Sequence, residues 1–102
     1  MIPGMGDQSA DPTIERLRAE ISEADRAILG AVNARIELVA ELKRHKEALG
    51  LPFVDSERER ILVEELVERN GGPLSPEGLR ELYDCLLSLT KREVARDGDL
   101  EA

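Results

Sequence analysis

The sequence is poor in aromatic residues, in cysteine and in long apolar runs. Its aromatic side chains are Phe53 and Tyr83, and Cys85 is its single cysteine. One cysteine excludes an internal disulfide framework. The longest uncharged stretch falls far short of the roughly 20 residues that a membrane-spanning helix needs, so we expect no membrane span. The chain has to fold around aliphatic side chains without a covalent crosslink.

Basic residues are outnumbered as well. The chain has 14 Lys and Arg against 22 Asp and Glu, which gives a formal net charge of −8. Nucleic-acid binding draws most of its affinity from Lys and Arg on phosphates, so this balance disfavours DNA or RNA as a partner. A site for an anion must therefore gather its cations locally, against the overall charge.

The length of 102 residues allows one small domain at most. A hydrophobic content of 41% is enough for a core, whereas 35% charged residues suit either a helical bundle or a disordered chain. The spacing of the apolar residues has to decide between the two. A domain of this size rarely holds together on a single core, so we expect oligomerisation.

The two ends of the chain differ from its middle. The first ten residues lack a basic segment followed by an apolar run, so we interpret residues 1–11 as a flexible leader rather than an export signal. We assign residues 12–96 to a helical domain and residues 97–102 to an acidic tail. We expect a cytoplasmic protein.

The first predicted helix is long. It starts at Asp11-Pro12, where Asp can cap and Pro fits the first turn, and it ends at residues 50–52, where Gly and Pro stop it. At 1.5 Å per residue, about 38 residues make a rod of roughly 57 Å, which a lone small protomer could not cover. Its apolar residues alternate steps of three and four: Ile14, Leu17, Ile21, Ala24, Ile28, Ala31, Leu38, Leu42 and Leu49.

Two shorter helices follow. Asp55 and Ser56 can each cap the second helix, and Ser56 with Glu59 has the pattern of a capping box. This helix ends at residues 70–73, and a third helix opens at residues 75–76. No strand pattern, repeat or second domain is visible, so the sequence predicts an all-α fold with one long and two shorter helices.

Two cations on the long helix do not fit a purely structural interpretation. The heptad of Ile14, Ile21 and Ile28 continues to Arg35, where a guanidinium needs either a carboxylate partner in an interhelical ion pair or an anionic ligand. Lys46 lies eleven residues further, on the same side of the helix, with the two Cα atoms ~16 Å apart. Between two such side chains there is room for a compact diacid.

Arg18 lies on the same helix but ~42 Å from Lys46. Within its own chain it cannot reach the same pocket. If the long helices of two chains run antiparallel, Arg18 arrives from the partner chain.

Four segments in this order resemble the all-helical family of chorismate mutases. They are similar to the family's opening pattern, its central arginine motif, its lysine segment, and its loop with the start of the second helix: Leu17–Ile21 with Asp25, Asn33–Val39, Lys43–Lys46 and Pro52–Glu59. The resemblance runs without gaps from about residue 14 to residue 60 and continues more weakly to residue 94. Each segment alone is weak evidence, but four at the right intervals are specific.

The resemblance implies an intertwined antiparallel homodimer of three-helix protomers that rearranges chorismate to prephenate. It also implies roles for the matching cations. Arg18 of the partner chain and Arg35 of the same chain would each bind a substrate carboxylate, and Arg58 would hold the other carboxylate. Lys46 would donate to the ether oxygen of chorismate. Lys46, Arg35, Arg58 and Glu59 are therefore the predicted catalytic residues.

The remaining positions implied by the resemblance are polar in the family. Glu59 would accept from the ring hydroxyl, and Asp55 would stand close by with a backbone or hydroxyl contact. Thr90 keeps a hydroxyl at a position that is usually serine. Val94 departs from the family, which carries Gln or Glu there facing the ether oxygen. This departure leaves Lys46 as the donor at that oxygen.

The rearrangement takes place within one molecule and needs no nucleophile, metal or cofactor, and the sequence has no metal-ligand cluster, phosphate loop or nucleophile elbow. Two alternatives keep the same fold: an isochorismate pyruvate lyase and an aminodeoxychorismate mutase. An alternative of another class is a non-catalytic helical dimerisation or regulatory module. In either class, the chain could work with a partner enzyme of the shikimate pathway.

Overall fold

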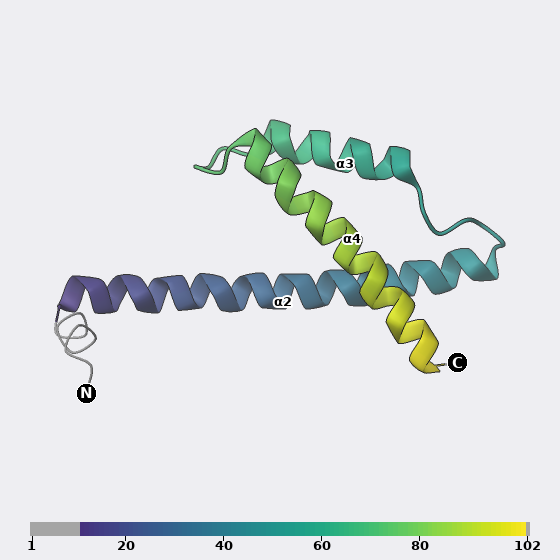
Figure 1. The fold of residues 1–102 in the computed structure, drawn as a ribbon, viewed down its shortest axis with the longest axis horizontal. Coiled ribbons are helices and arrows are strands. Elements are labelled where there is room, and N and C mark those ends of the chain that lie inside the picture. The colour runs from purple at the N-terminus through teal and green to yellow at the C-terminus, as the bar shows by residue number, and fades with distance from the viewer. Residues whose placement is uncertain (1–10, 102) are drawn as a thin grey trace. The chain divides into compact units, whose positions relative to one another are not determined.

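The computed structural model of the chain describes the backbone of residues 11–101 and the side chains of residues 11–96. Three helices account for most of this part: α2 (Pro12–Ala48), α3 (Ser56–Arg69) and α4 (Pro76–Glu101) (Figure 1). The described residues contain no strand. The predicted all-α fold with one long and two shorter helices is confirmed.

The predicted domain boundaries meet this structure in two places. Residues 1–10 of the predicted leader lie outside the described residues. At the other end, α4 continues as a helix past Arg96 to Glu101, into the segment assigned to an acidic tail. The boundaries themselves stay predictions. Within residues 11–101, no helix combines the length and the apolar character that a bilayer crossing requires.

The ends of α2 are fixed by local hydrogen bonds. At its start, Oδ1 of Asp11 accepts from the backbone N–H of Thr13 (2.8 Å) and of Ile14 (3.1 Å), which confirms the predicted cap. At its end, Gly50 takes a positive φ of 70°, a conformation that costs glycine little. The N–H of Leu51 then donates to the carbonyl of Lys46 (2.8 Å), and the N–H of Gly50 donates to that of Glu47 (3.1 Å). This pair of bonds is a Schellman motif, which reverses the chain direction after α2. The carbonyl of Lys46 is one of its two acceptors.

The start of α3 differs from the expected capping box. Asp55 is the N-cap, and its Oδ1 accepts from the N–H of Arg58 (3.0 Å). Ser56 is already the first helical residue, and the Glu59 carboxylate pairs with Lys91 of α4 instead of reaching back to the cap. Of the two predicted caps, Asp55 is confirmed. The predicted Ser56–Glu59 capping box is wrong, because Asp55, one residue before Ser56, holds the cap position.

The chain divides into two compact units, Met1–Ala34 and Arg35–Ala102, and each is described by itself. In the described part of the first unit, residues 12–34 are helical. Large apolar side chains along it are exposed in the single chain: Leu17 by 46%, Ile21 by 58% and Ile28 by 61%. These are positions of the apolar series that the sequence placed on a packed face.

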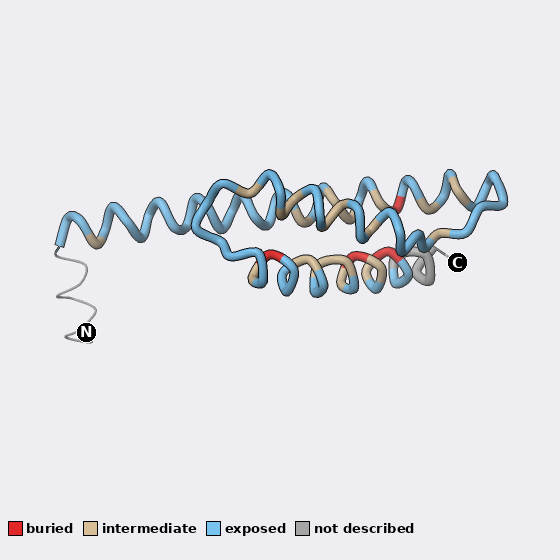
Figure 2. The backbone as a smooth tube through the Cα atoms, turned by 90° about the horizontal axis from the view of Figure 1, so that it is seen from above, coloured by how far each residue is buried: buried red, intermediate tan, exposed pale blue. Residues whose placement is uncertain are grey.

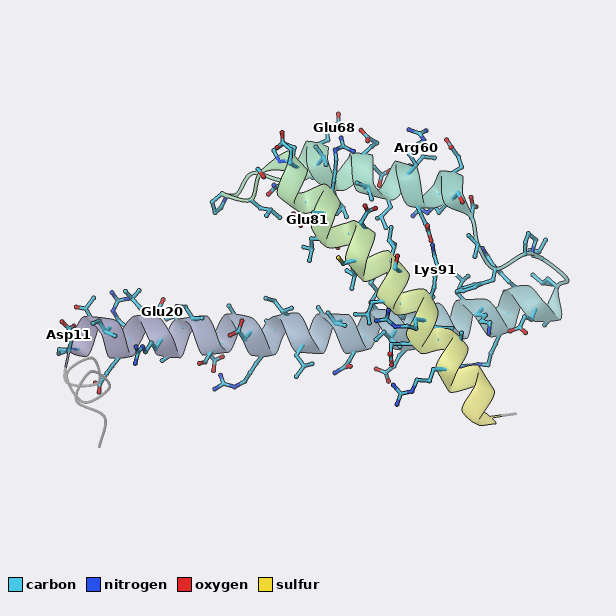
Figure 3. The ribbon with its side chains drawn as sticks, viewed as in Figure 1. Asp11, Glu20, Arg60, Glu68, Glu81 and Lys91 are labelled. Atoms are coloured by element: carbon cyan, nitrogen blue, oxygen red, sulfur yellow. The ribbon has the colours of Figure 1, made fainter. Side chains whose placement is uncertain are left out.

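The second unit contains the end of α2 together with α3 and α4. Among its described residues, the buried positions lie along α4, with one on α2 (Figure 2): Ala40, Leu79, Thr90 and Val94. On the surface, α3 and α4 are joined by an ion pair between Glu64 and Arg80 (2.7 Å). The hydrogen bond and the charge of Arg80 hold the pKa of Glu64 below the usual value of a glutamate carboxyl. Arg60 and Glu68 lie on the face of α3 turned away from α4 (Figure 3).

We predict that the cap of α3 depends on Asp55 and not on Ser56. Asp55→Ala should lower the free energy of unfolding by about 1 kcal/mol, because the N–H of Arg58 loses its acceptor. Urea denaturation at a fixed protein concentration measures this, with Ser56→Ala as the matched control expected to stay within about 0.5 kcal/mol of wild type. An equal loss in both variants would contradict the assignment of the cap.

Candidate active site

A cavity of about 240 Å³ lies in the second unit, between the end of α2, the connection to α3, the first turns of α3, and α4. Aliphatic side chains form part of its wall: Val39, Leu42, Leu62 and Leu87. Predicted site residues form another part: Arg35, Lys46, Asp55, Arg58, Glu59 and Thr90. The structure thus brings six of the eight predicted positions to one cavity.

Arg35 is held from across the unit by a neutral group. Its Nη1 donates to Oγ1 of Thr90 on α4 (2.8 Å), and the Thr90 hydroxyl donates in turn to the carbonyl of Leu86 (2.7 Å). Thr90 is only 1% exposed, so this hydroxyl is shielded from water. The sequence predicts either a carboxylate on another helix or an anionic ligand as the partner of Arg35. Among the described residues, no carboxylate pairs with Arg35. The guanidinium is oriented without being neutralised.

Lys46 is held in a similar way. Its Nζ donates to the backbone carbonyl of Phe53 (3.2 Å), which lies just beyond the turn that ends α2. The ring of Phe53 also lies under Nζ of Lys43, at 5.9 Å from the ring centroid, within the range of a cation–π contact. A carbonyl accepts one N–H of the three on an ammonium, so two N–H groups of Lys46 remain as donors.

Three polar side chains reach the cavity from the first turn of α3 and its cap. Asp55 caps the helix, and Arg58 and Glu59 follow within the same turn. Arg58 is exposed, whereas Glu59 is half-buried. Because residues of one helical turn are close neighbours, the cap that begins α3 also places Arg58 and Glu59 at the cavity wall.

Lys91 also lines the cavity, and it is not among the site residues predicted from the sequence. Its Nζ lies 2.9 Å from Oε1 of Glu59, which joins α4 to α3. A signal was present: Lys91 follows Leu87 by four residues and Tyr83 by eight, so it continues an apolar face of the helix. A cation in an apolar register is the same signal that identified Arg35.

Arg18 and Val94 are not among the residues that line this cavity. Arg18 belongs to the first unit and is exposed in the single chain. Val94 is 2% exposed and is part of the buried face of α4. Their assignment to substrate binding stays a prediction.

The charges around the cavity are unbalanced in favour of cations. Arg35, Lys46, Arg58 and Lys91 face only two carboxylates, in a chain whose net charge is −8. Such a cavity attracts a small anion with more than one negative charge, and its aliphatic wall suits a compact carbon skeleton. Among the described residues there is no group of three or more His, Cys, Asp or Glu that could hold a metal ion.

The comparison with protein families identifies the family of this chain. The model of the family "Chorismate mutase type II" matches residues 17–94. The chain belongs to this family. The match includes every predicted site residue from Arg18 to Val94, and it confirms the family that the sequence motifs indicated.

Related structures have the same fold. A structure of chorismate mutase from Thermus thermophilus (Form II) is 32% identical in sequence and superposes with a TM-score of 0.77, covering 82% of this chain and 96% of that chain. The Form I structure from the same organism is 33% identical, with a TM-score of 0.74, covering 76% of this chain and 98% of that chain.

A curated relative is much longer. The bifunctional chorismate mutase/prephenate dehydratase of Aquifex aeolicus (strain VF5) is 33% identical over an alignment of 87 positions that covers 78% of this chain and 24% of that protein. The chain thus spans about a quarter of the length of this relative.

We predict that the hydroxyl of Thr90 stabilises the second unit through Arg35. Thr90→Val keeps the shape of the side chain but removes the acceptor of the Arg35 bond, and should lower the free energy of unfolding by about 1 kcal/mol. Thr90→Ser keeps the hydroxyl and is the matched control for the altered side chain. Urea denaturation of both at one protein concentration is the measurement. A Val variant at least as stable as the Ser variant would contradict the role of the bond.

Proposed function

We propose that the chain converts chorismate to prephenate, acting as an isomerase. The observation that carries this proposal is the meeting of Arg35, Lys46, Arg58 and Glu59 at one cavity, in a chain that belongs to the type II chorismate mutase family. The reaction breaks a C–O bond and forms a C–C bond within one molecule. It therefore requires a folded substrate conformation and stabilisation of developing charge, but no nucleophile.

Holding the substrate is the task of the arginines. Chorismate carries two carboxylates, and Arg35 and Arg58 come from different helices, so each can bind a different end of a bent dianion. Restricting the substrate to a reactive conformation removes an entropic part of the barrier and can contribute several kcal/mol. Thr90 supports this role, because its hydroxyl fixes Nη1 of Arg35 before any ligand arrives, and its place in the lining also allows the predicted substrate contact.

Stabilising charge is the task of Lys46. The ether oxygen gains negative charge as its C–O bond breaks, and a fixed ammonium beside it lowers the energy of the transition state more than that of the substrate. The bond from Nζ of Lys46 to the Phe53 carbonyl holds the ammonium in place and leaves two N–H groups for a ligand. One donor of this kind is worth about 3 to 4 kcal/mol.

The carboxylates of α3 complete the proposed contacts. Glu59 accepts a hydrogen bond from the ring hydroxyl of the substrate, since a carboxylate at the wall can only accept. Asp55 stands beside it with its Oδ1 engaged in the cap, and its contact with the substrate is through the backbone or toward a hydroxyl.

We also propose that the active form is an antiparallel homodimer in which Arg18 of the partner subunit completes the cavity. The exposed apolar side chains of residues 11–34 support this, because a second copy of the long helix would remove them from water. Arg18 is matched by the family model and is not among the residues that line the cavity, as expected of a residue that a partner supplies.

The cellular setting is proposed on less specific grounds. The name of the Aquifex relative joins a chorismate mutase to a prephenate dehydratase, which supports a partner enzyme of the shikimate pathway for this chain. The cytoplasmic location stays a prediction from the sequence.

The test is to incubate the purified chain separately with chorismate, isochorismate and aminodeoxychorismate and to identify the products by NMR. We expect prephenate from chorismate. Lys46→Ala should remain folded by circular dichroism and lose about 100-fold or more in kcat, because the ether oxygen loses its donor.

Other products would assign the cavity to another reaction. Pyruvate release from isochorismate would favour a lyase, and rearrangement of aminodeoxychorismate alone would favour the corresponding mutase. Turnover of none would favour a non-catalytic module. A loss of kcat below about tenfold in Lys46→Ala would remove Lys46 from the proposed role.

A further inference from the structure

Lys91 is a cavity cation to which neither the sequence analysis nor the proposed reaction gives a function. It lies on α4 directly after Thr90, and the two residues bind in different directions: Thr90 accepts from Arg35 of α2, and Lys91 donates to Glu59 of α3 (2.9 Å). The Lys91 side chain is 35% exposed and that of Glu59 is 27% exposed. Lys91 (labelled in Figure 3) thus places a positive charge beside the Glu59 carboxylate, which is proposed to contact the substrate ring.

The Lys91–Glu59 ion pair affects which hydrogen-bond donors of a ligand the Glu59 carboxylate can bind. Lys91 occupies Oε1, and the second carboxylate oxygen can still accept a hydrogen bond from a neutral hydroxyl. A positively charged substituent at the same place would gain the attraction of Glu59 but would also meet the repulsion of the Lys91 ammonium. At the distance of a hydrogen-bonded neighbour, these two charges nearly cancel for an incoming cation.

The same geometry without Lys91 would behave differently. An uncompensated Glu59 carboxylate would favour a cationic substituent over a neutral one, because attraction between unlike charges adds to the hydrogen bond. The ammonium of Lys91 therefore acts on the choice of ligand rather than on the bond-breaking step.

We propose that Lys91 is a specificity-determining residue that makes the cavity select a ring hydroxyl over a ring amino group. In aminodeoxychorismate an amino group replaces the ring hydroxyl of chorismate, and a primary amine is protonated near pH 7. The inference rests on the proposed function, since it assumes that Glu59 faces this ring position. It assigns the preference between the two substrates to the Lys91–Glu59 pair.

The experiment compares kcat/KM for chorismate with kcat/KM for aminodeoxychorismate in wild type and in Lys91→Met. We expect the ratio to shift toward the amino substrate by about tenfold, as expected for removal of one partly screened charge. Lys91→Arg should keep the wild-type ratio within about twofold, because the charge is retained. Lys91→Gln is measured in parallel, as a second uncharged variant, and should behave like Lys91→Met.

Arg80→Met is the matched control. It removes another ion pair between α4 and α3, Arg80–Glu64 at 2.7 Å, which does not line the cavity. It should leave the ratio unchanged. An unchanged ratio in folded Lys91→Met would overturn the proposal, as would an equal shift in Arg80→Met. Failure of both uncharged Lys91 variants to fold, with Arg80→Met folded, would show that Lys91 has a structural role and would also overturn it.

Failure of the proposal for Lys91 can be distinguished from failure of the proposed function. If wild type turns over neither substrate, the proposed reaction is wrong, and the same ratio is then measured from the two dissociation constants by calorimetry. A tenfold shift in that ratio would still support the selection of the hydroxyl by Lys91. Absence of binding to either compound would contradict both proposals.

Discussion

Mutual repulsion between its cations is the interaction that the cavity has to overcome. Arg35, Lys46, Arg58 and Lys91 line one space of about 240 Å³. Like charges gathered around one cavity repel one another, and an anion bound between them relieves this repulsion. In this chain, a hydroxyl and a backbone carbonyl hold two of them: Thr90 binds Arg35, and Phe53 binds Lys46.

Neutral acceptors have a functional consequence. An ion pair would have fixed Arg35 equally well, but it would have cancelled the charge that a dianionic ligand needs. A hydroxyl that already donates to Leu86 can only accept from Arg35, so the orientation of the guanidinium is fixed while its charge stays available. Lys91 is the exception, because it pairs with the carboxylate of Glu59. We propose that this pair acts in ligand selection, whereas Arg35 and Lys46 keep their charge for the bound anion.

Much of this arrangement follows from the sequence, for identifiable reasons. The start of α2 was predictable because Asp11 and Pro12 act locally, and Arg35 was recognisable because a charge interrupts a regular apolar heptad. Lys91 was missed, although it continues the apolar register of Tyr83 and Leu87. The choice of Asp55 over Ser56 as the cap depends on a one-residue shift of the helix start, which spacing does not resolve.

Other features depend on contacts that the sequence does not display. The motif that placed Thr90 at the site says nothing of its bond to Arg35, because the two residues are 55 positions apart and meet only after α4 has packed. Val94 is predicted to contact the substrate from the family pattern, and this contact stays a prediction. The structure shows that the valine is 2% exposed and lies in the buried face of α4.

In the proposed dimer, one cavity takes Arg35 from its own chain and Arg18 from a second copy. Subunit complementation is the decisive test of this sharing. Arg18→Ala and Arg35→Ala are each expected to be nearly inactive; after equal amounts are unfolded together and refolded, half of the dimers are mixed, and each mixed dimer holds one intact site. We expect recovery of roughly a quarter of wild-type chorismate mutase activity. Mixed dimers that form but show no more activity than either variant alone would contradict it.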